Sequence, residues 1–151
     1  MLRAAVKAAA EIASPGAPPP QLLAVTVLTS MDATELKAIG IAQSAAEQPL
    51  RLGRMAMDSG VAGLVCSPEE VGALRQDSGK DALLVTPGIR PAGSATNDQK
   101  RLATPAAAIA AGASYLVIGR PITQAPNPLQ AAQAILREME NALHAGARGT
   151  L

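Results

Sequence analysis

The 151-residue sequence contains no phenylalanine and no tryptophan, and Tyr115 is its single aromatic residue. Proteins that bind single-stranded nucleic acid stack the bases on aromatic side chains, so this absence argues against that function. Cys66 is the only cysteine, which leaves no possibility of an internal disulfide or of a zinc site built from several cysteines. We therefore expect a cytoplasmic location.

Strong charge of one sign and long hydrophobic runs are also lacking. Thirteen Lys and Arg residues stand against twelve Asp and Glu residues, and no stretch collects five or more like charges. The longest apolar runs, such as residues 22–28 and 106–113, are much shorter than the ~20 residues that cross a bilayer. Neither a nucleic-acid partner nor a membrane is expected.

Four short apolar segments have the character of parallel strands: residues 22–28, 61–66, 82–86 and 114–118. The first of them is expected to be buried on both faces. Helices are predicted around them, over residues 2–13, 32–39, 48–59, 67–76, 104–111 and 127–144. This alternation indicates parallel β/α units joined by right-handed crossovers. Since a complete eightfold barrel needs ~250 residues, the chain is expected to form one domain, either a small open α/β sheet or about half of a barrel.

Two helix starts carry clear local signals. Asp32 is a plausible N-cap for the helix that Gly40 ends. Ser67, followed by Pro68 and then by Glu70, has the pattern of a capping box that would start a helix at Ser67. Capping explains Glu69 and Glu70 without a role in a site.

Polar residues follow the end of each predicted strand: Thr29 and Ser30, then Ser67, then Arg90, then Gly119 and Arg120. In α/β proteins this edge of the sheet carries the active site, and in barrels the loops after the last two strands commonly hold a phosphate. A guanidinium group offers a fixed fork of donors to phosphate oxygens. The alternative is that Gly119 and Arg120 form only a turn with a solvated arginine.

The remaining reactive side chains are expected to be structural. Cys66 closes a strand and has no histidine near it in the sequence, which favours a buried, inert thiol. His144 lies near the predicted end of the last helix, where a cation is favoured by the helix dipole. We assign neither residue a site, and we expect no metal and no cofactor.

Five segments, taken together, resemble the C-terminal part of orotidine 5'-phosphate decarboxylases. In order, they are residues 25–31 (VTVLTSM), 61–67 (VAGLVCS), 84–94 (LVTPGIRPAGS), Asp98 with Gln99, and 115–123 (YLVIGRPIT). The resemblance covers almost the whole chain. It implies strands five to eight of a (β/α)8 TIM barrel, from an enzyme of pyrimidine biosynthesis that converts orotidine 5'-phosphate to UMP and carbon dioxide without metal or cofactor.

The resemblance also implies roles for five residues. Arg120, the backbone of Gly119, and Gln99 would hold the substrate phosphate, and Arg90 would lie in the substrate site. Thr29 would lie near the pyrimidine and ribose. Residues 91–99 would form a lid over the phosphate, so that remote binding energy helps to assemble the site.

The chain departs from the family in one important respect. The family's catalytic Asp and Lys residues lie on a D-x-K-x-x-D motif, and the nearest string here, Asp98-Gln99-Lys100, has Ala103 in the last position. We therefore expect a fragment that keeps the phosphate-binding half. A non-catalytic nucleotide-binding half barrel, a purely structural fragment, and part of a related sugar-phosphate enzyme remain alternatives.

The resemblance further suggests that the intact protein is a homodimer, and a separate N-terminal half could complement this chain. A half barrel exposes unpaired strand edges. We therefore expect self-association or poor solubility.

Overall fold

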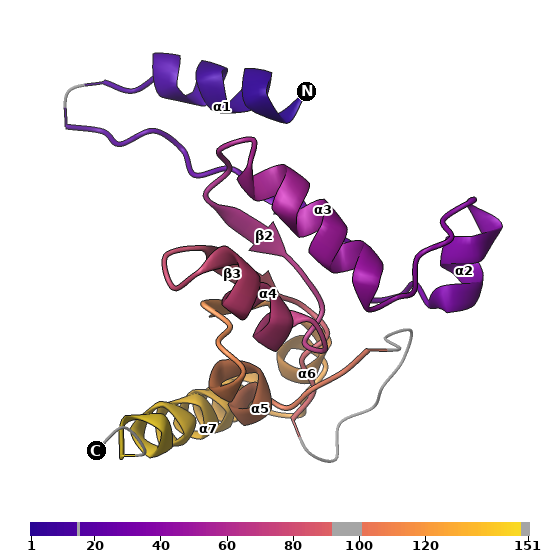
Figure 1. Cartoon of the computed structure of the whole chain (residues 1–151). Helices are drawn as coiled ribbons and strands as arrows, with labels where there is room; N and C mark the ends of the chain where they lie inside the picture. Colours follow the sequence, from indigo (N-terminus) through magenta and orange to yellow (C-terminus); the bar gives the residue numbers. More distant parts are fainter. Residues whose placement is uncertain (15, 92–100, 149–151) are drawn as a thin grey trace.

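The computed structural model describes residues 1–14, 16–91 and 101–148, and its centre is one parallel sheet (Figure 1). Its four strands are β1 (Leu23–Val25), β2 (Gly63–Val65), β3 (Leu83–Thr86) and β4 (Tyr115–Leu116), in the spatial order β1-β2-β3-β4. Each strand pairs in parallel with the next along the chain. Sequential order of this kind belongs to a β/α barrel, whereas in a doubly wound sheet the order reverses. The predicted α/β class with parallel strands is confirmed.

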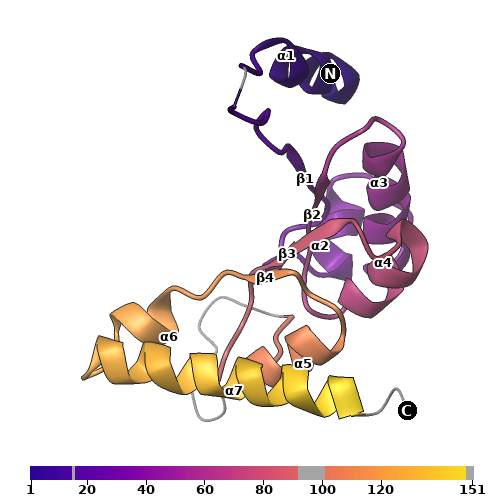
Figure 2. The same ribbon diagram turned by 90° about the vertical axis from the view of Figure 1, so that its left-hand side faces the viewer.

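Seven helices complete the described part of the chain: α1 (Leu2–Glu11), α2 (Ala33–Ala38), α3 (Glu47–Met57), α4 (Val71–Ser78), α5 (Pro105–Ala110), α6 (Arg120–Thr123) and α7 (Pro128–Arg148). Helices α3 and α4 lie together beside the sheet, while α5 and α6 pack along the long α7 (Figure 2). None of the helices in the described ranges is long and apolar enough to span a membrane.

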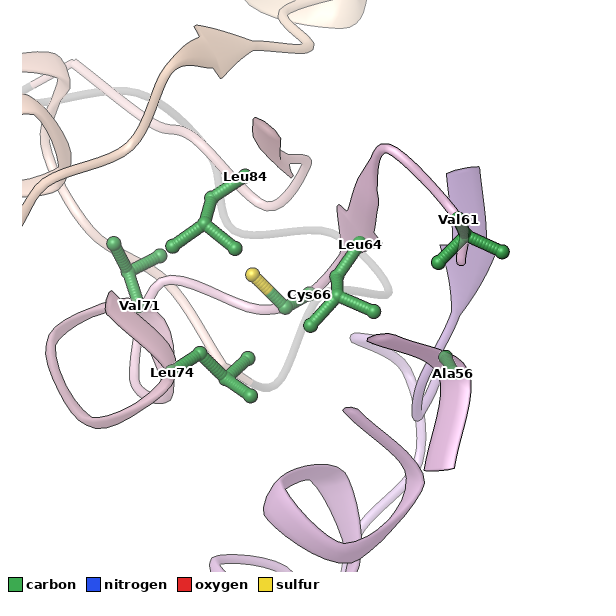
Figure 3. Close-up of a cluster of buried hydrophobic side chains, with 7 residues drawn as sticks. All are labelled: Ala56, Val61, Leu64, Cys66, Val71, Leu74 and Leu84. Atoms are coloured by element: carbon green, nitrogen blue, oxygen red, sulfur yellow. The ribbon is translucent and has the colours of Figure 1, made fainter. Parts of the chain in front are cut away.

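The apolar core lies between the sheet and helices α3 and α4. Seven buried residues form it, and Figure 3 shows how they converge: Ala56, Val61, Leu64, Cys66, Val71, Leu74 and Leu84. Gly53 of α3 allows a close approach to this cluster, since a Cβ atom there would lie 2.8 Å from Leu74 Cδ2 and 3.1 Å from Leu64 Cδ1. Small and branched side chains thus replace the missing aromatic residues.

The opposite face of the sheet is open. Strand register aligns Val25, Val65, Val85 and Tyr115 in one row, and both end members of that row are 58% exposed. We call the exposed residues Leu23, Val25, Tyr115 and Val117 the open face. The prediction that the first strand is buried on both faces was wrong, because the face of β1 that carries Leu23 and Val25 is left uncovered by the described residues.

Helix α4 begins later than its sequence suggests. Residues 67–70 form a turn, in which the Glu70 amide donates to the Ser67 carbonyl at 3.2 Å, and the helix starts at Val71. The Glu70 carboxylate accepts from the Ser67 amide at 2.9 Å, but the Ser67 hydroxyl has no partner among the described residues. Only half of the predicted capping box forms. By contrast, the predicted N-cap Asp32 is confirmed, and it forms a complete capping box with Glu35 that the sequence analysis did not predict.

The C-terminal third differs from expectation at two points. Gly119 does not sit in a plain turn, because its carbonyl accepts from the amides of Ile122 at 2.8 Å and Thr123 at 3.0 Å, which begins α6. Helix α7 continues to Arg148, beyond the predicted end at His144. Leu143 and Ala145, on either side of His144, are good helix formers and favour this continuation.

The amino ends of the strands are tied together by one guanidinium group. Arg75 donates to the carbonyls of Gly79 (2.8 Å), Lys80 (3.1 Å), Ala82 (2.7 Å) and Gly112 (2.8 Å), and also to the Ser114 hydroxyl (2.9 Å). Ala82 precedes β3 and Ser114 precedes β4. Arg75 therefore fixes the end of α4 to the starts of two strands.

Candidate functional site

Polar side chains are buried where the strands end, at the carboxyl edge of the sheet. Within the described ranges they are Thr29, Ser67, Glu70, Thr86, Arg90 and Arg101, and Gln48 is the one buried polar residue elsewhere. Thr29 follows β1, Ser67 follows β2, and Arg90 follows β3. A buried polar group is stable only with hydrogen-bonding partners, so the contacts at this edge define the site.

A buried ion pair lies at the centre of this edge. The Arg101 guanidinium is 5% exposed and pairs with the Glu70 carboxylate. Its Nη2 donates to the carbonyls of Leu28 at 2.8 Å and of Val27 at 3.4 Å. Burial lowers the pKa of Arg101, because desolvation opposes the charged form. One side chain thereby joins the segment after β1 to the turn after β2.

Sequence reasoning missed this pair. It assigned Glu70 to helix capping and gave Arg101 no role, although the two residues are 31 positions apart and pair through the fold. No pattern among neighbouring residues in the sequence predicts an ion pair between two positions so far apart. The capping pattern was misleading, because one carboxylate oxygen of Glu70 accepts from the Ser67 amide while the other pairs with Arg101.

Two of the predicted site residues are anchored to the same short segment. Thr29 is 8% exposed and Arg90 is 9% exposed. The Arg90 amide donates to the Ala103 carbonyl at 2.9 Å, and its Nη1 donates to the Ile89 carbonyl at 2.8 Å. Thr29 directly follows Leu28, whose carbonyl Arg101 holds. Residues 101–103 therefore connect the predicted substrate positions of two strands.

Gly119 and Arg120 follow the end of β4, at the same edge of the sheet. The Val117 amide donates to the Thr86 carbonyl at 2.9 Å, which sets this strand end beside that of β3. Gly119 is exposed and Arg120 is half-buried. Four of the five predicted site residues thus follow strand ends at one edge. The fifth, Gln99, lies outside the described residues, as does most of the predicted lid.

Cys66 lies below this edge, inside the apolar core. Burial raises the pKa of its thiol to about 11, so the thiol is neutral near pH 7. This agrees with the predicted buried, inert cysteine. Among the described residues, no group of three or more His, Cys, Asp or Glu side chains is placed to hold a metal ion.

Sequential parallel strands with buried polar groups at their carboxyl edge define part of a β/α barrel. Residues 1–135 match the orotidine 5'-phosphate decarboxylase / HUMPS family. The chain belongs to this family, which confirms the resemblance drawn from the five segments.

Individual relatives agree with this assignment. The orotidine 5'-phosphate decarboxylase of Nitrosococcus oceani is 53% identical over 136 residues, which are 90% of this chain and 59% of the relative. That of Gluconobacter oxydans is 54% identical over 123 residues, or 82% and 52% of the two chains. The crystal structure of the Lactobacillus acidophilus enzyme superposes with a TM-score of 0.76 at 41% identity, covering 92% of this chain and 58% of that one.

The chain thus spans somewhat more than half the length of these relatives. Its four strands correspond to part of their barrel, and the prediction of a partial (β/α)8 barrel is confirmed.

Proposed function

We propose that this chain supplies the phosphate-binding part, and a share of the nucleoside-binding part, of an orotidine 5'-phosphate decarboxylase site. The observation that carries the proposal is the placement of Thr29, Arg90, Gly119 and Arg120, which all follow strand ends at one edge of the sheet. This is the edge at which β/α barrels bind their substrates. The whole enzyme would convert orotidine 5'-phosphate to UMP and carbon dioxide.

Each residue has a distinct part in this proposal. The Arg120 guanidinium forms a charged, directional contact with the phosphate, and Gly119 lets the backbone approach it without a side chain in the way. Arg90 and Thr29 face the remainder of the nucleotide. Gln99 is assigned to the phosphate only because Asp98 and Gln99 match the sequence motif of the family.

Decarboxylation itself requires groups that this chain does not carry. Loss of carbon dioxide leaves an electron pair on a ring carbon, and a positioned acid must deliver a proton to it. The family's Asp and Lys residues on D-x-K-x-x-D would do so, and this motif does not occur in the 151 residues. We therefore expect this chain by itself to bind nucleotide without turnover.

The open face favours a partner that covers it. Its exposed apolar residues lie in β1, in β4 or directly after β4. Each of these two strands has one neighbouring strand in the described sheet. A complementing N-terminal half, with further strands and the acid-bearing motif, would pair both edges and complete the barrel. Without it we expect copies of this chain to associate through these edges, in a cytoplasmic enzyme that is itself a homodimer.

Sedimentation velocity over a range of concentrations tests the partner proposal. We expect species larger than one chain that dissociate when a polypeptide carrying the N-terminal half of a relative is added. The proposal would be contradicted if the chain stays monomeric at high concentration and does not bind this polypeptide.

Calorimetric titration of the 151-residue chain with UMP tests the binding function. We expect saturable binding that falls about tenfold to a hundredfold in Arg120→Ala, since a hydrogen bond to a charged group contributes about 1.5–3 kcal/mol. Arg137→Ala is the matched control, because Arg137 is an exposed arginine on α7. Equal loss in both variants, or no binding by the folded chain, would overturn the proposed function.

A further inference from the structure

The contacts of the segment 101–103 reach three separate strand ends. The Arg101 guanidinium pairs with Glu70 in the turn after β2 and donates to the carbonyls of Val27 and Leu28 after β1. Two residues further along, Ala103 accepts from the Arg90 amide at 2.9 Å and donates to the Gly88 carbonyl at 3.3 Å. The segment 101–103 therefore connects the loops that follow β1, β2 and β3.

Stability alone does not explain such a pair. Burying two charges carries a desolvation penalty that often equals or exceeds their attraction, and apolar residues of similar volume commonly serve as well. A guanidinium fork differs from an apolar side chain in that it fixes the relative positions of several acceptors. Here the fixed acceptors are the Glu70 carboxylate and the carbonyl that directly precedes Thr29.

The two ends of the proposed site differ in their dependence on this pair. Thr29 adjoins a carbonyl that Arg101 holds, and Arg90 is bonded through its amide to the same segment. Gly119 and Arg120 begin α6, where the amides of residues 122–125 donate to carbonyls of residues 119–122. Arg101 and the segment it begins are therefore connected to the loops that carry Thr29 and Arg90, and none of the Arg101 contacts among the described residues is with Gly119 or Arg120.

We propose that Arg101, through its ion pair with Glu70, is a positioning residue that sets the loops carrying Thr29 and Arg90 for recognition of the nucleoside part of the ligand. This inference rests on the proposed function. It adds two residues that the sequence motifs did not single out, and it assigns them to specificity for a nucleoside monophosphate over a bare phosphate.

The test compares two ligands, UMP and inorganic phosphate. In the double variant Arg101→Met with Glu70→Leu, both charges are removed together, so no unpaired buried charge remains. We expect UMP affinity to fall about tenfold, in line with the loss of roughly one well-placed contact, while phosphate affinity stays within about twofold. Arg75→Lys is the matched control, because it weakens an equally engaged guanidinium at the opposite edge. It should leave the ratio of the two affinities unchanged.

A ligand-free measurement keeps the two proposals separate. Amide hydrogen exchange of Ser67 and Arg90 reports the bonds of these amides to Glu70 and Ala103. In Arg101→Lys, which keeps the charge but lacks the fork, we expect faster exchange at both amides. The Ser114 amide, bonded to the Leu84 carbonyl at 2.9 Å near the amino edge, should exchange as before.

The results of these two experiments distinguish a failure of the positioning role from a failure of the proposed function. Unchanged exchange at Ser67 and Arg90, or a proportional loss of affinity for both ligands, would overturn the positioning role. A wild-type chain that is folded but binds neither ligand would instead overturn the proposed function, and the exchange result would still decide whether Arg101 sets the loops.

Discussion

The two edges of the sheet each contain a heavily bonded arginine, but their surroundings differ. At the amino edge, all three guanidinium nitrogens of Arg75 donate to carbonyls or to a hydroxyl. At the carboxyl edge, Arg101 Nε and the Ser67 hydroxyl are buried without a partner in the described part of the chain. Ser78 Oγ, at the end of α4 near the amino edge, is also buried without a partner among the described residues, so the difference between the edges lies in their two arginines. A fully paired guanidinium stabilises a fold, whereas an unpaired buried nitrogen calls for another explanation. Under the proposed function, the amino edge serves stability and the carboxyl edge serves binding.

The largest expected effect comes from the sheet that supports both edges. In Gly63→Ala, the new Cβ atom would lie 2.0 Å from the Leu83 carbonyl oxygen and 2.6 Å from Leu83 Cβ. We expect β2 and β3 to be forced apart, with a loss of about 4 kcal/mol or more in the free energy of unfolding. Urea denaturation measures this loss, and ligand binding should disappear with the fold.

Gly72→Ala is the matched control for that prediction. A Cβ atom at this position in α4 meets nothing within 4 Å. Alanine favours a helix over glycine by roughly 0.5–1 kcal/mol, so this variant should be slightly more stable than the wild type. Similar destabilisation in both variants would show that the close approach at Gly63 is unimportant.

Removing the arginine of the amino edge should separate stability from binding. Arg75→Met leaves the carbonyls of Gly79, Lys80, Ala82 and Gly112 without this donor. We expect the free energy of unfolding to fall by about 2–4 kcal/mol, since unsatisfied partly buried groups each carry a penalty. UMP affinity, measured well below the unfolding transition, should stay within about twofold of the wild-type value. A large loss of affinity would contradict the division between the edges.

The core below the carboxyl edge predicts a smaller effect that depends on pH. The folded pKa of Cys66 is about 11, above the ordinary value of 9.0, so the folded state holds its proton more tightly than the unfolded state does. Stability is therefore unaffected below pH 9 and falls as the pH rises from 9 towards 11. The loss reaches roughly 2–3 kcal/mol at the upper end.

Cys66→Ala provides the comparison for the pH effect. Its free energy of unfolding should be lower at neutral pH because core volume is lost, but the decline between pH 9 and 11 should be shallower than that of the wild type. Parallel declines in the two proteins would assign the alkaline loss to other groups.

Sequence reasoning succeeded where a signal is local or repeats along the chain. Short apolar runs located all four strands, and Asp32 was identified as a cap because it directly precedes the helix that Gly40 ends. It failed at β1, because whether a strand face is covered depends on distant parts of the fold and not on the strand's own residues. It failed at Glu70 for a related reason, since Arg101 becomes its partner only after the sheet has formed.

The site was predictable in part. Thr29, Arg90, Gly119 and Arg120 follow strand ends, and the parallel arrangement brings those ends to one edge. Arg75 and Arg101 were not predictable as the two anchoring side chains, because their partners are backbone carbonyls, the distant Ser114 hydroxyl and the distant Glu70 carboxylate. Every residue has a backbone carbonyl group, so the sequence does not show which carbonyls accept a hydrogen bond from an arginine.

The most direct test of the division between the edges is a heteronuclear NMR titration of the labelled chain with UMP. We predict saturable shifts of the amide signals of Thr29, Arg90, Gly119 and Arg120, with the signals of Gly112 and Ser114 at the amino edge unmoved. In Arg120→Ala the titration should require about tenfold to a hundredfold more UMP, so that the shifts are much smaller at the concentrations that just saturate the wild type. A well-dispersed spectrum with no shifts, or with shifts centred on the amino edge, would contradict the account.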